Sequence, residues 1–244
     1  MNKYLAIDLG NTRTKLGFFE QDVFLKNIII KNNELRRLKE ILKGEKIDKA
    51  IISSVNREAE MLIDYNGFEF TCMRLSSTTA LPFKHKYTTI ETLGADRMAV
   101  VAAGQKAFPN QNVLVIDAGS CITYDFLTDG SIYLGGAISP GIMMRLRAMH
   151  GFTNALPLLK WDGETVPKII GNSTVNSIFS GAINGAIAEI EGFMSLYNQQ
   201  YSDVKTIITG GDARFFEKAV KNTIFADPNL VLKGLNELLI YNGE

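Results

Sequence analysis

The hydrophobic positions at the start of the chain fall into short runs typical of strands. Segment 3–10 is apolar, segment 14–20 alternates between apolar and polar residues, and segment 23–30 is apolar and β-branched. Short turns separate the three runs, so we predict an antiparallel meander. A helical period follows at 32–45, with a polar N-cap candidate and Gly44 near its end.

The remainder of the first half alternates between strand and helix patterns. Segments 48–55 and 68–75 are predicted strands, and segment 57–65 between them is a predicted helix, which together indicate an α/β protein. Segment 76–92 has no clear period and is expected to be a long connection, a kind of segment that often carries function. Segment 93–108 is a predicted helix with Asp96 and Arg97 in its first turn.

The second half repeats the opening pattern. The segment from Leu5 returns at Leu114, and both copies read strand, turn, strand, turn, strand. The matching pairs are Leu5/Leu114, Ile7/Ile116, Asp8/Asp117, Gly10/Gly119 and Thr14/Thr123, with similar residues at Val23/Ile132 and Phe24/Tyr133. We therefore predict two similar α/β halves, 1–111 and 112–244, that face each other. The second half continues with predicted helices at 173–201 and 213–221, a buried strand at 204–211 and the closing segment 236–242.

Composition narrows the possible classes of protein. The 244 residues include 46% hydrophobic ones, enough for a sizeable core, and 26 basic residues balance 26 acidic ones. This balance argues against bulk electrostatic binding to nucleic acid. No apolar run is long enough to cross a bilayer, and the apolar stretch at the N-terminus is too short for a signal peptide. We expect a cytoplasmic protein without membrane attachment.

The few cysteines and histidines restrict the possible chemistry. Cys72 and Cys121 lack the spacing of a metal site and are expected to be small buried thiols. His85 and His150 are the two histidines, and no Ser-His-Asp arrangement is apparent. Acid–base chemistry is therefore expected from carboxylates.

The turn after the first strand combines an acid, a glycine, a hydroxyl and an amine. Gly10 lets the backbone approach a ligand closely, Thr12 adds a hydroxyl, and Lys15 adds a compact positive charge suited to phosphate. Asp8 would repel a bare phosphate but fits a hydrated Mg²⁺ between them. We interpret the turn as a clasp for Mg²⁺ and nucleotide phosphate. An ordinary polar hairpin is the alternative, which explains two copies in register less well.

Three other glycine-rich or acidic segments accompany this turn. The second copy of the loop carries Asp117 and Ser120. Segment 207–212 could hold an adenine or ribose on its exposed backbone, although for this segment alone a simple strand-to-helix turn is the favoured interpretation. In segment 135–142, Pro140 suits a first helical turn and the glycines suggest close approach by a ligand or by the opposing half.

These motifs resemble those of the actin, sugar-kinase and heat-shock chaperone ATPase superfamily. More narrowly, the chain resembles type III pantothenate kinases over essentially its whole length. The resemblance rests on DLGNTRTK (8–15), GADR (94–97), DAGSCIT (117–123), GGAISPG (135–141) and GNST (171–174), in the expected order. It implies a duplicated ribonuclease-H-like fold, with two lobes that each hold a mixed five-stranded sheet and helices, and an active site in the cleft between them.

The resemblance also implies roles for individual residues. The catalytic base maps to Asp96, for which a helix N-terminal acid is the purely structural alternative. The residues that correspond to ATP and phosphate contacts are Asp8, Leu9, Gly10, Asn11, Thr12, Arg13, Thr14, Lys15 and Ser120. Those that correspond to pantothenate contacts are Tyr87, Gly94, Ala95, Asp96, Arg97 and Thr174. For Tyr87 the alternative is an aromatic packed on the core, and for Thr174 it is a helix N-cap.

Cofactors and partners are implied in the same way. Asp117 maps to the ligand of a monovalent cation, K⁺ or NH₄⁺, and Mg²⁺ is expected with ATP. The family usually has Thr and Ala where this chain has Ser120 and Cys121, which affects the tuning of ATP or cation affinity rather than the reaction. A homodimer with the substrate pocket near the subunit interface is expected.

The expected activity is ATP-dependent phosphorylation of pantothenate to 4′-phosphopantothenate, the first step of coenzyme A biosynthesis. Two alternatives remain at this point. One is a non-catalytic regulatory factor with the same fold, and the other is a superfamily kinase that acts on another small alcohol. Intact Asp8, Lys15, Asp96 and Arg97 argue against the first, and the GADR segment argues against the second.

Overall fold

The structure is a computed structural model that describes residues 2–54, 56–63, 67–221 and 224–243. Its contacts divide the chain into two compact units. Unit 1 comprises Met1–Pro109, Ser131–Tyr133 and Asn229–Glu244, and unit 2 comprises Asn110–Gly130 and Leu134–Pro228. Among the residues described, no helix is both long and apolar enough to cross a membrane.

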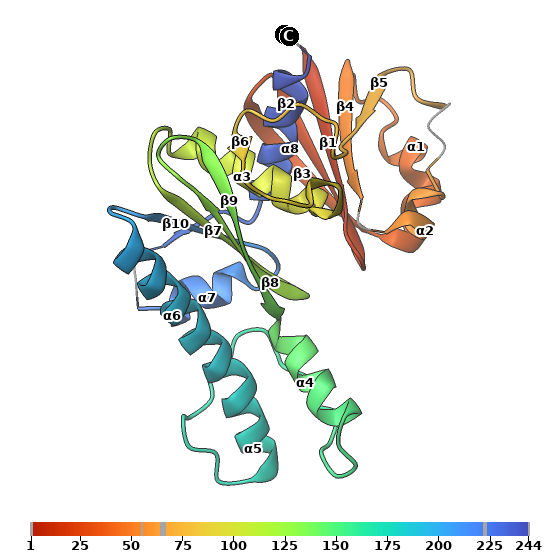
Figure 1. The fold of residues 1–244 in the computed structure, drawn as a ribbon. Coiled ribbons are helices and arrows are strands. Elements are labelled where there is room, and N and C mark those ends of the chain that lie inside the picture. The colour runs from red at the N-terminus through yellow and green to blue at the C-terminus, as the bar shows by residue number, and fades with distance from the viewer. Residues whose placement is uncertain (1, 55, 64–66, 222–223, 244) are drawn as a thin grey trace. The chain divides into compact units, whose positions relative to one another are not determined.

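Unit 1 is built on a mixed five-stranded sheet with the order β3-β2-β1-β4-β5 (Figure 1). Its strands are β1 (Lys3–Leu9), β2 (Arg13–Glu20), β3 (Val23–Lys31), β4 (Lys49–Ser54) and β5 (Thr71–Arg74). The first three form the predicted antiparallel meander, and β1, β4 and β5 run parallel. The apolar runs of β1 and β4 are buried because helices cover both faces of the sheet.

The two faces of this sheet carry different helices. Leu5, Ile7 and Leu9 pack with the short helices that follow β3 and β4, and Leu35 and Leu38 belong to the same cluster. The 3₁₀ helix η1 (Asn32–Arg37), α1 (Leu38–Ile41) and α2 (Arg57–Glu60) lie on this face. Helices α3 (Ala95–Ala107) and α8 (Leu230–Tyr241) pack against each other, and α8 contacts β1 and β4 (Figure 1).

Unit 2 holds most of a six-stranded sheet with the order β11-β10-β7-β8-β9-β6. Its strands are β6 (Lys84–His85), β7 (Val113–Ala118), β8 (Cys121–Leu127), β9 (Ile132–Pro140), β10 (Lys205–Thr209) and β11 (Phe225–Ala226). The series β9-β8-β7-β10-β11 repeats the order β3-β2-β1-β4-β5, which supports the duplication predicted from sequence. This sheet has one strand more than the five predicted. The additional strand is β6, which lies in the segment predicted to be a connection and pairs with Ile132 and Tyr133 of unit 1.

The strand register shows how the two copies correspond. Asp8 pairs with Lys15 across the first hairpin, and Asp117 pairs with Thr123 across the second. Leu9 pairs with Thr14, whereas Ala118 pairs with Ile122, so the second turn is one residue shorter. The structural counterpart of Thr123 is therefore Lys15 and not Thr14, the residue that the alignment without a gap matches to it.

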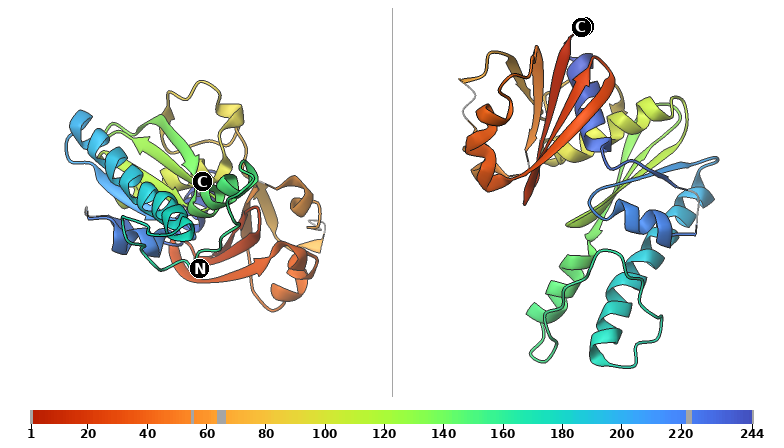
Figure 2. Two further views of the ribbon diagram at one scale, coloured as in Figure 1. Left: turned by 90° about the horizontal axis from the view of Figure 1, so that it is seen from below. Right: turned by 180° about the vertical axis from the view of Figure 1, so that it is seen from behind.

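The helices of unit 2 are α4 (Ile142–Gly151), α5 (Thr174–Phe179), the π-helical turn η4 (Ser180–Asn184), α6 (Gly185–Gln200) and α7 (Ala213–Ala219). The long helix predicted at 173–201 is present, with η4 as a bulge inside it. Helix α4 and the segment around α5 extend beyond the sheet of their own unit (Figures 1 and 2).

Some elements differ from their predicted extents. The helix predicted at 32–45 is broken into η1 and α1, and the helical part of 57–65 ends at Glu60, with 64 and 65 outside the described residues. The closing helix α8 begins at Leu230 and clusters with unit 1, although a division at 111/112 assigns it to the second half. At Gly234 the backbone of α8 approaches Ala99 so closely that an added Cβ would lie 1.8 Å from the Ala99 carbonyl oxygen.

Candidate active site

The loop after β1 has the tight geometry that its sequence predicts. The Gly10 N–H donates to the Arg13 carbonyl oxygen at 3.1 Å, which closes the turn. Burial raises the pKa of Asp8 to about 6; Lys15 opposes this rise, and the negative charge of Asp96 adds to it. Asp8 also pairs with Lys15 across the β1–β2 hairpin, so the loop places a carboxylate and an ammonium group on adjacent strands.

Asn32 fixes this loop through its side chain, a role that the sequence did not predict. Its side-chain amide donates to the carbonyl oxygens of Gly10 at 2.9 Å and Asn11 at 3.1 Å. Its Oδ1 accepts a hydrogen bond from Thr14 Oγ1 at 2.9 Å. The backbone of the turn is thus tied to the first residue of η1.

The predicted ATP contacts of this loop divide into exposed and buried residues. Asn11, Thr12 and Arg13 are exposed. Leu9 is fully buried, and so is Thr14, whose hydroxyl is directed to Asn32. Of these five residues, Asn11, Thr12 and Arg13 therefore have side chains that a ligand can reach.

The start of α3 carries the GADR segment. Asp96 Oδ1 accepts a hydrogen bond from the Arg97 N–H at 2.9 Å, within the first turn of the helix. A Cβ added at Gly94 would lie 2.4 Å from Asp96 Oδ1, so the glycine leaves room for this carboxylate. Ala95 is the first residue of the helix and is half-buried.

Arg97 is buried and held by two tyrosines. Its Nη2 donates to Tyr133 Oη at 3.0 Å and its Nη1 to Tyr87 Oη at 3.5 Å. The two rings stack with centroids 5.9 Å apart, and the guanidinium lies 5.6 Å from the Tyr87 ring centroid. Tyr87 thus lies beside Arg97. Tyr133 also contacts Arg97, which the sequence did not predict because Tyr133 lies far along the chain at the start of β9.

The second loop lies at the equivalent end of β7 in unit 2. Asp117 is half-buried and Ser120 is exposed. Gly210, at φ +97°, lies beside this loop, and a Cβ there would be 2.4 Å from Asp117 Oδ1 and 2.2 Å from the Ala118 carbonyl oxygen. The Asp212 N–H donates to that carbonyl at 2.9 Å, and burial raises the Asp212 pKa to about 6. Gly210 therefore allows close packing on the Asp117 loop.

Thr174 is the exposed first residue of α5. The N-cap of this helix is Ser173, whose Oγ accepts a hydrogen bond from the Asn176 N–H at 3.2 Å. The structural alternative for Thr174 is therefore wrong, and its side chain is left to solvent or a ligand.

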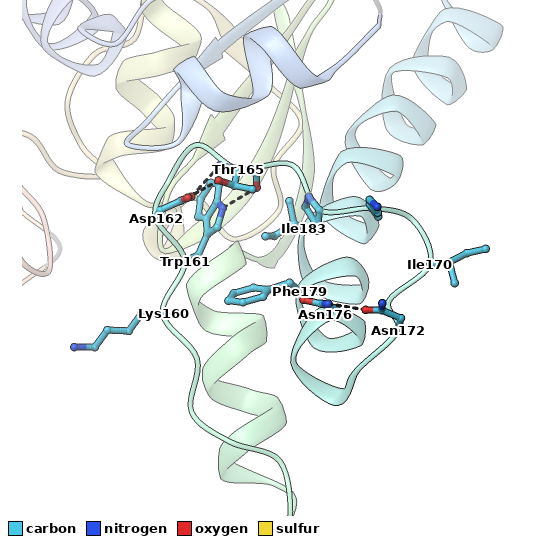
Figure 3. A pocket seen from close by; sticks show the side chains of 11 residues that line it. Lys160, Trp161, Asp162, Thr165, Ile170, Asn172, Asn176, Phe179 and Ile183 are labelled. Atoms are coloured by element: carbon cyan, nitrogen blue, oxygen red, sulfur yellow. Dashed lines mark hydrogen bonds between the residues drawn. The ribbon is translucent and has the colours of Figure 1, made fainter.

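A cavity of about 470 Å³ lies beside α5 in unit 2. Trp161 and Thr165 reach it from the loop before α5, and Phe179 and Ile183 line it from the helix (Figure 3). Two hydrogen bonds hold this loop. Trp161 Nε1 donates to the Thr165 carbonyl oxygen at 3.2 Å, and the Thr165 N–H donates to Asp162 Oδ1 at 2.8 Å. None of the predicted site residues lines this cavity.

Within the described part of the chain, no three His, Cys, Asp or Glu side chains gather as a metal-binding group. Cys72 and Cys121 are free thiols, and burial raises the Cys72 pKa to about 11, so this thiol is neutral near neutral pH. The two strand-end acids, Asp8 and Asp117, are the carboxylates that the loops present. Each could hold one cation together with ligand oxygens and water.

Solved structures of low sequence identity share this fold. A protein from Campylobacter jejuni named as a Baf family transcriptional activator superposes with a TM-score of 0.63 at 22% identity, with 98% of each chain covered. A polyphosphate/ATP-glucomannokinase from Arthrobacter sp. strain KM gives 0.51 at 12% identity, over 100% of this chain and 99% of that one. The structure thus has the actin-like ATPase and sugar-kinase fold, as predicted.

Sequence comparison identifies the family. The profile of type III pantothenate kinase matches residues 4–196. A type III pantothenate kinase of Christiangramia forsetii is 42% identical over 240 residues, which cover 98% of each chain, and one of Bacteroides fragilis (strain YCH46) is 40% identical over 239 residues, again with 98% of each. The chain belongs to the type III pantothenate kinase family.

Proposed function

We propose that this protein uses ATP to phosphorylate pantothenate to 4′-phosphopantothenate, the first step of coenzyme A biosynthesis. Family membership over nearly the whole chain supports the substrate. The observation that carries the chemistry is the pairing of Asp8 with Lys15 across the β1–β2 hairpin, which places a carboxylate and an ammonium group together at the phosphate loop. Since ATP is the phosphoryl donor, we assign the reaction to the cytoplasm.

The residues of unit 1 take the following roles. The backbone of the turn 10–13 and the Lys15 ammonium bind phosphate oxygens of ATP, and Asn32 fixes the turn. Asp96 orients the primary hydroxyl of pantothenate and accepts its proton as the hydroxyl oxygen bonds to the γ-phosphorus and ADP leaves. Arg97 binds the pantothenate carboxylate, with Tyr87 and Tyr133 fixing the plane of the guanidinium.

Mg²⁺ fits the loop at Asp8. A carboxylate whose ionised form is disfavoured by burial gains from a nearby divalent cation, which supports this assignment. When bound, Mg²⁺ neutralises phosphate charge during transfer. Asp8 would hold it through water, as Mg²⁺ prefers.

In unit 2, Asp117 binds a monovalent cation, K⁺ or NH₄⁺, and Ser120 contacts ATP. The Asp117 carboxylate, half-buried at the end of β7, would supply an oxygen ligand to such a cation. Thr174 hydrogen-bonds pantothenate, which its free position at the start of α5 supports.

We also propose a homodimer through the segment around α4 and α5. Phe152, Ile169 and Ile170 are 91%, 77% and 81% exposed, respectively. Large apolar side chains gathered on one segment mark an interaction site, and a second copy of the chain would cover them. The substrate pocket is expected near this interface.

An ATP-turnover assay with and without pantothenate tests the proposed reaction. We expect ADP formation that depends on pantothenate and on Mg²⁺. ADP formation that depends instead on a sugar or another alcohol would contradict the substrate. A folded protein that binds ATP without turnover on any acceptor would favour the regulatory alternative.

A further inference from the structure

Two buried hydroxyls have no hydrogen-bond partner among the described residues. These hydroxyls are Ser53 Oγ and Thr209 Oγ1, and both residues are fully buried. A buried hydroxyl without a partner destabilises the fold, so such a group is typically explained by a water, an ion or a ligand. The one other such atom is Asn236 Oδ1, whose own amide group still donates to the Gln21 carbonyl at 2.8 Å.

The two hydroxyls occupy equivalent places in the duplicated fold. Ser53 lies on β4 and pairs with Asp8 on β1. Thr209 lies on β10 and pairs with Asp117 on β7. Strands β4 and β10 hold the same position in the two sheet orders. Paired residues of adjacent parallel strands lie about 4.8 Å apart and share one face of the sheet.

Each half of the protein therefore presents an acid at the end of one strand and an unpaired hydroxyl beside it on the next. The neighbouring residues differ in charge. In unit 1 the row across the sheet is Lys15, Asp8 and Ser53, whereas in unit 2 it is Thr123, Asp117 and Thr209. A row with an ammonium group suits phosphate and hydrated Mg²⁺, and a row with hydroxyl oxygens suits a bare monovalent cation.

We propose that Ser53 and Thr209 are ligand-binding hydroxyls. Ser53 hydrogen-bonds the water shell of the Mg²⁺ held by Asp8, and the Thr209 oxygen coordinates the monovalent cation together with Asp117. This inference rests on the proposed function, which supplies the two ions, and it assigns each ion a second side chain. The pair of groups occurs in both halves, while the residue on the neighbouring strand differs.

The proposal predicts opposite effects on the free protein and on its ligand response. Ser53→Ala and Thr209→Val remove a hydroxyl that finds no partner in the described part of the chain, so the unfolding temperature without ligand should be unchanged or higher. The ligand response should weaken, because loss of a group that orients a metal ligand typically reduces metal affinity about 10–100-fold.

Thermal unfolding of the full chain measures both effects. The unfolding temperature is recorded at increasing KCl concentrations, with NaCl added to keep the total salt constant. It is also recorded at increasing Mg²⁺ concentrations in the presence of a non-hydrolysable ATP analogue. For Thr209→Val we expect the K⁺ concentration at half-maximal shift to rise about tenfold or more, and Thr209→Ser to restore it. For Ser53→Ala we expect a similar rise in the Mg²⁺ concentration at which the shift in unfolding temperature is half-maximal.

Ser54→Ala is the matched control, because the Ser54 hydroxyl already bonds locally to the backbone of Asn56. It should leave both ligand responses unchanged. Variants that unfold at lower temperature and keep the wild-type ligand shifts would overturn the proposal, as would variants with no change in either property. A wild-type protein with no K⁺ shift would contradict the cation in the proposed function itself, and the role of Thr209 with it.

Discussion

At the scale of single residues, the site depends on the space around its carboxylates. Asp96 lies against Gly94, where any side chain would meet its Oδ1. Asp8 is held in a buried position that raises its pKa. The sequence predicted both carboxylates as site residues. Their surroundings could not be predicted, because they depend on contacts that form only in the folded protein.

Gly94→Ala should therefore impair catalysis without unfolding the protein. The added Cβ pushes the flexible Asp96 carboxylate aside, and a misplaced base should lower kcat about 10–100-fold. Steady-state kinetics and circular dichroism measure the two effects.

Gly192→Ala on α6 is its control, since nothing lies within 4 Å of a Cβ at that position. It should retain full activity and gain about 0.5–1 kcal/mol of stability from higher helix propensity. Normal kcat in Gly94→Ala would show that the contact with Asp96 does not matter.

Asp8→Asn should stabilise the protein while abolishing Mg²⁺-dependent nucleotide binding. The folded-state pKa of about 6 lies above the ordinary 3.8, so the folded protein binds the extra proton between these values and stability falls as pH rises through that window. Above pH 6 the ionised carboxylate opposes folding, and its removal should add about 1–3 kcal/mol. Urea unfolding at pH 7 and pH 4 should show a gain at pH 7 that shrinks at pH 4. A loss of stability at pH 7 would contradict this account.

At the scale of elements, the loop depends on a helix that follows it in the chain. Hydrogen bonds from Asn32, at the start of η1, fix the backbone of Gly10 and Asn11. The sequence predicted a helix beginning at this point, but not its contact with the loop, because the contact needs β2 and β3 to return the chain. Tyr133 was missed for the same reason, since β9 brings it to Arg97.

Asn32→Ala should raise the KM for ATP about tenfold with a smaller change in kcat. Loss of the amide leaves two carbonyls and the Thr14 hydroxyl without their partner, which should also cost about 1–3 kcal/mol of stability. Asn33→Ala, at the exposed neighbouring position, should change neither property. Equal effects of the two substitutions on the KM for ATP would show that the hydrogen bonds of Asn32 to the loop do not support ATP binding.

At the scale of the whole molecule, the sequence revealed the class of fold because the repeat and the strand pattern are local signals. The order of five strands recurs in the two sheets as the repeat implied. The short strand β6 escaped prediction because two residues carry no period, and the clustering of α8 with unit 1 escaped because only tertiary contacts determine it.

The homodimer gives a prediction at this scale. Replacing Ile169 and Ile170 with serine should convert the dimer to a monomer, because it removes exposed apolar surface from the proposed interface. Light scattering after size-exclusion chromatography measures the mass, and the KM for pantothenate should rise in parallel. A wild-type protein that runs as a monomer would contradict the assembly.

The most direct test of the central claim is product analysis with Asp96→Asn. The pure protein is mixed with Mg²⁺, ATP, K⁺ and pantothenate, and 4′-phosphopantothenate is followed by mass spectrometry. We predict product from the wild-type protein and none above background from the variant, which should unfold at a similar temperature and still bind ATP. Near-normal product from Asp96→Asn would contradict the assignment of the base, and no product from a folded, ATP-binding wild-type protein would contradict the reaction.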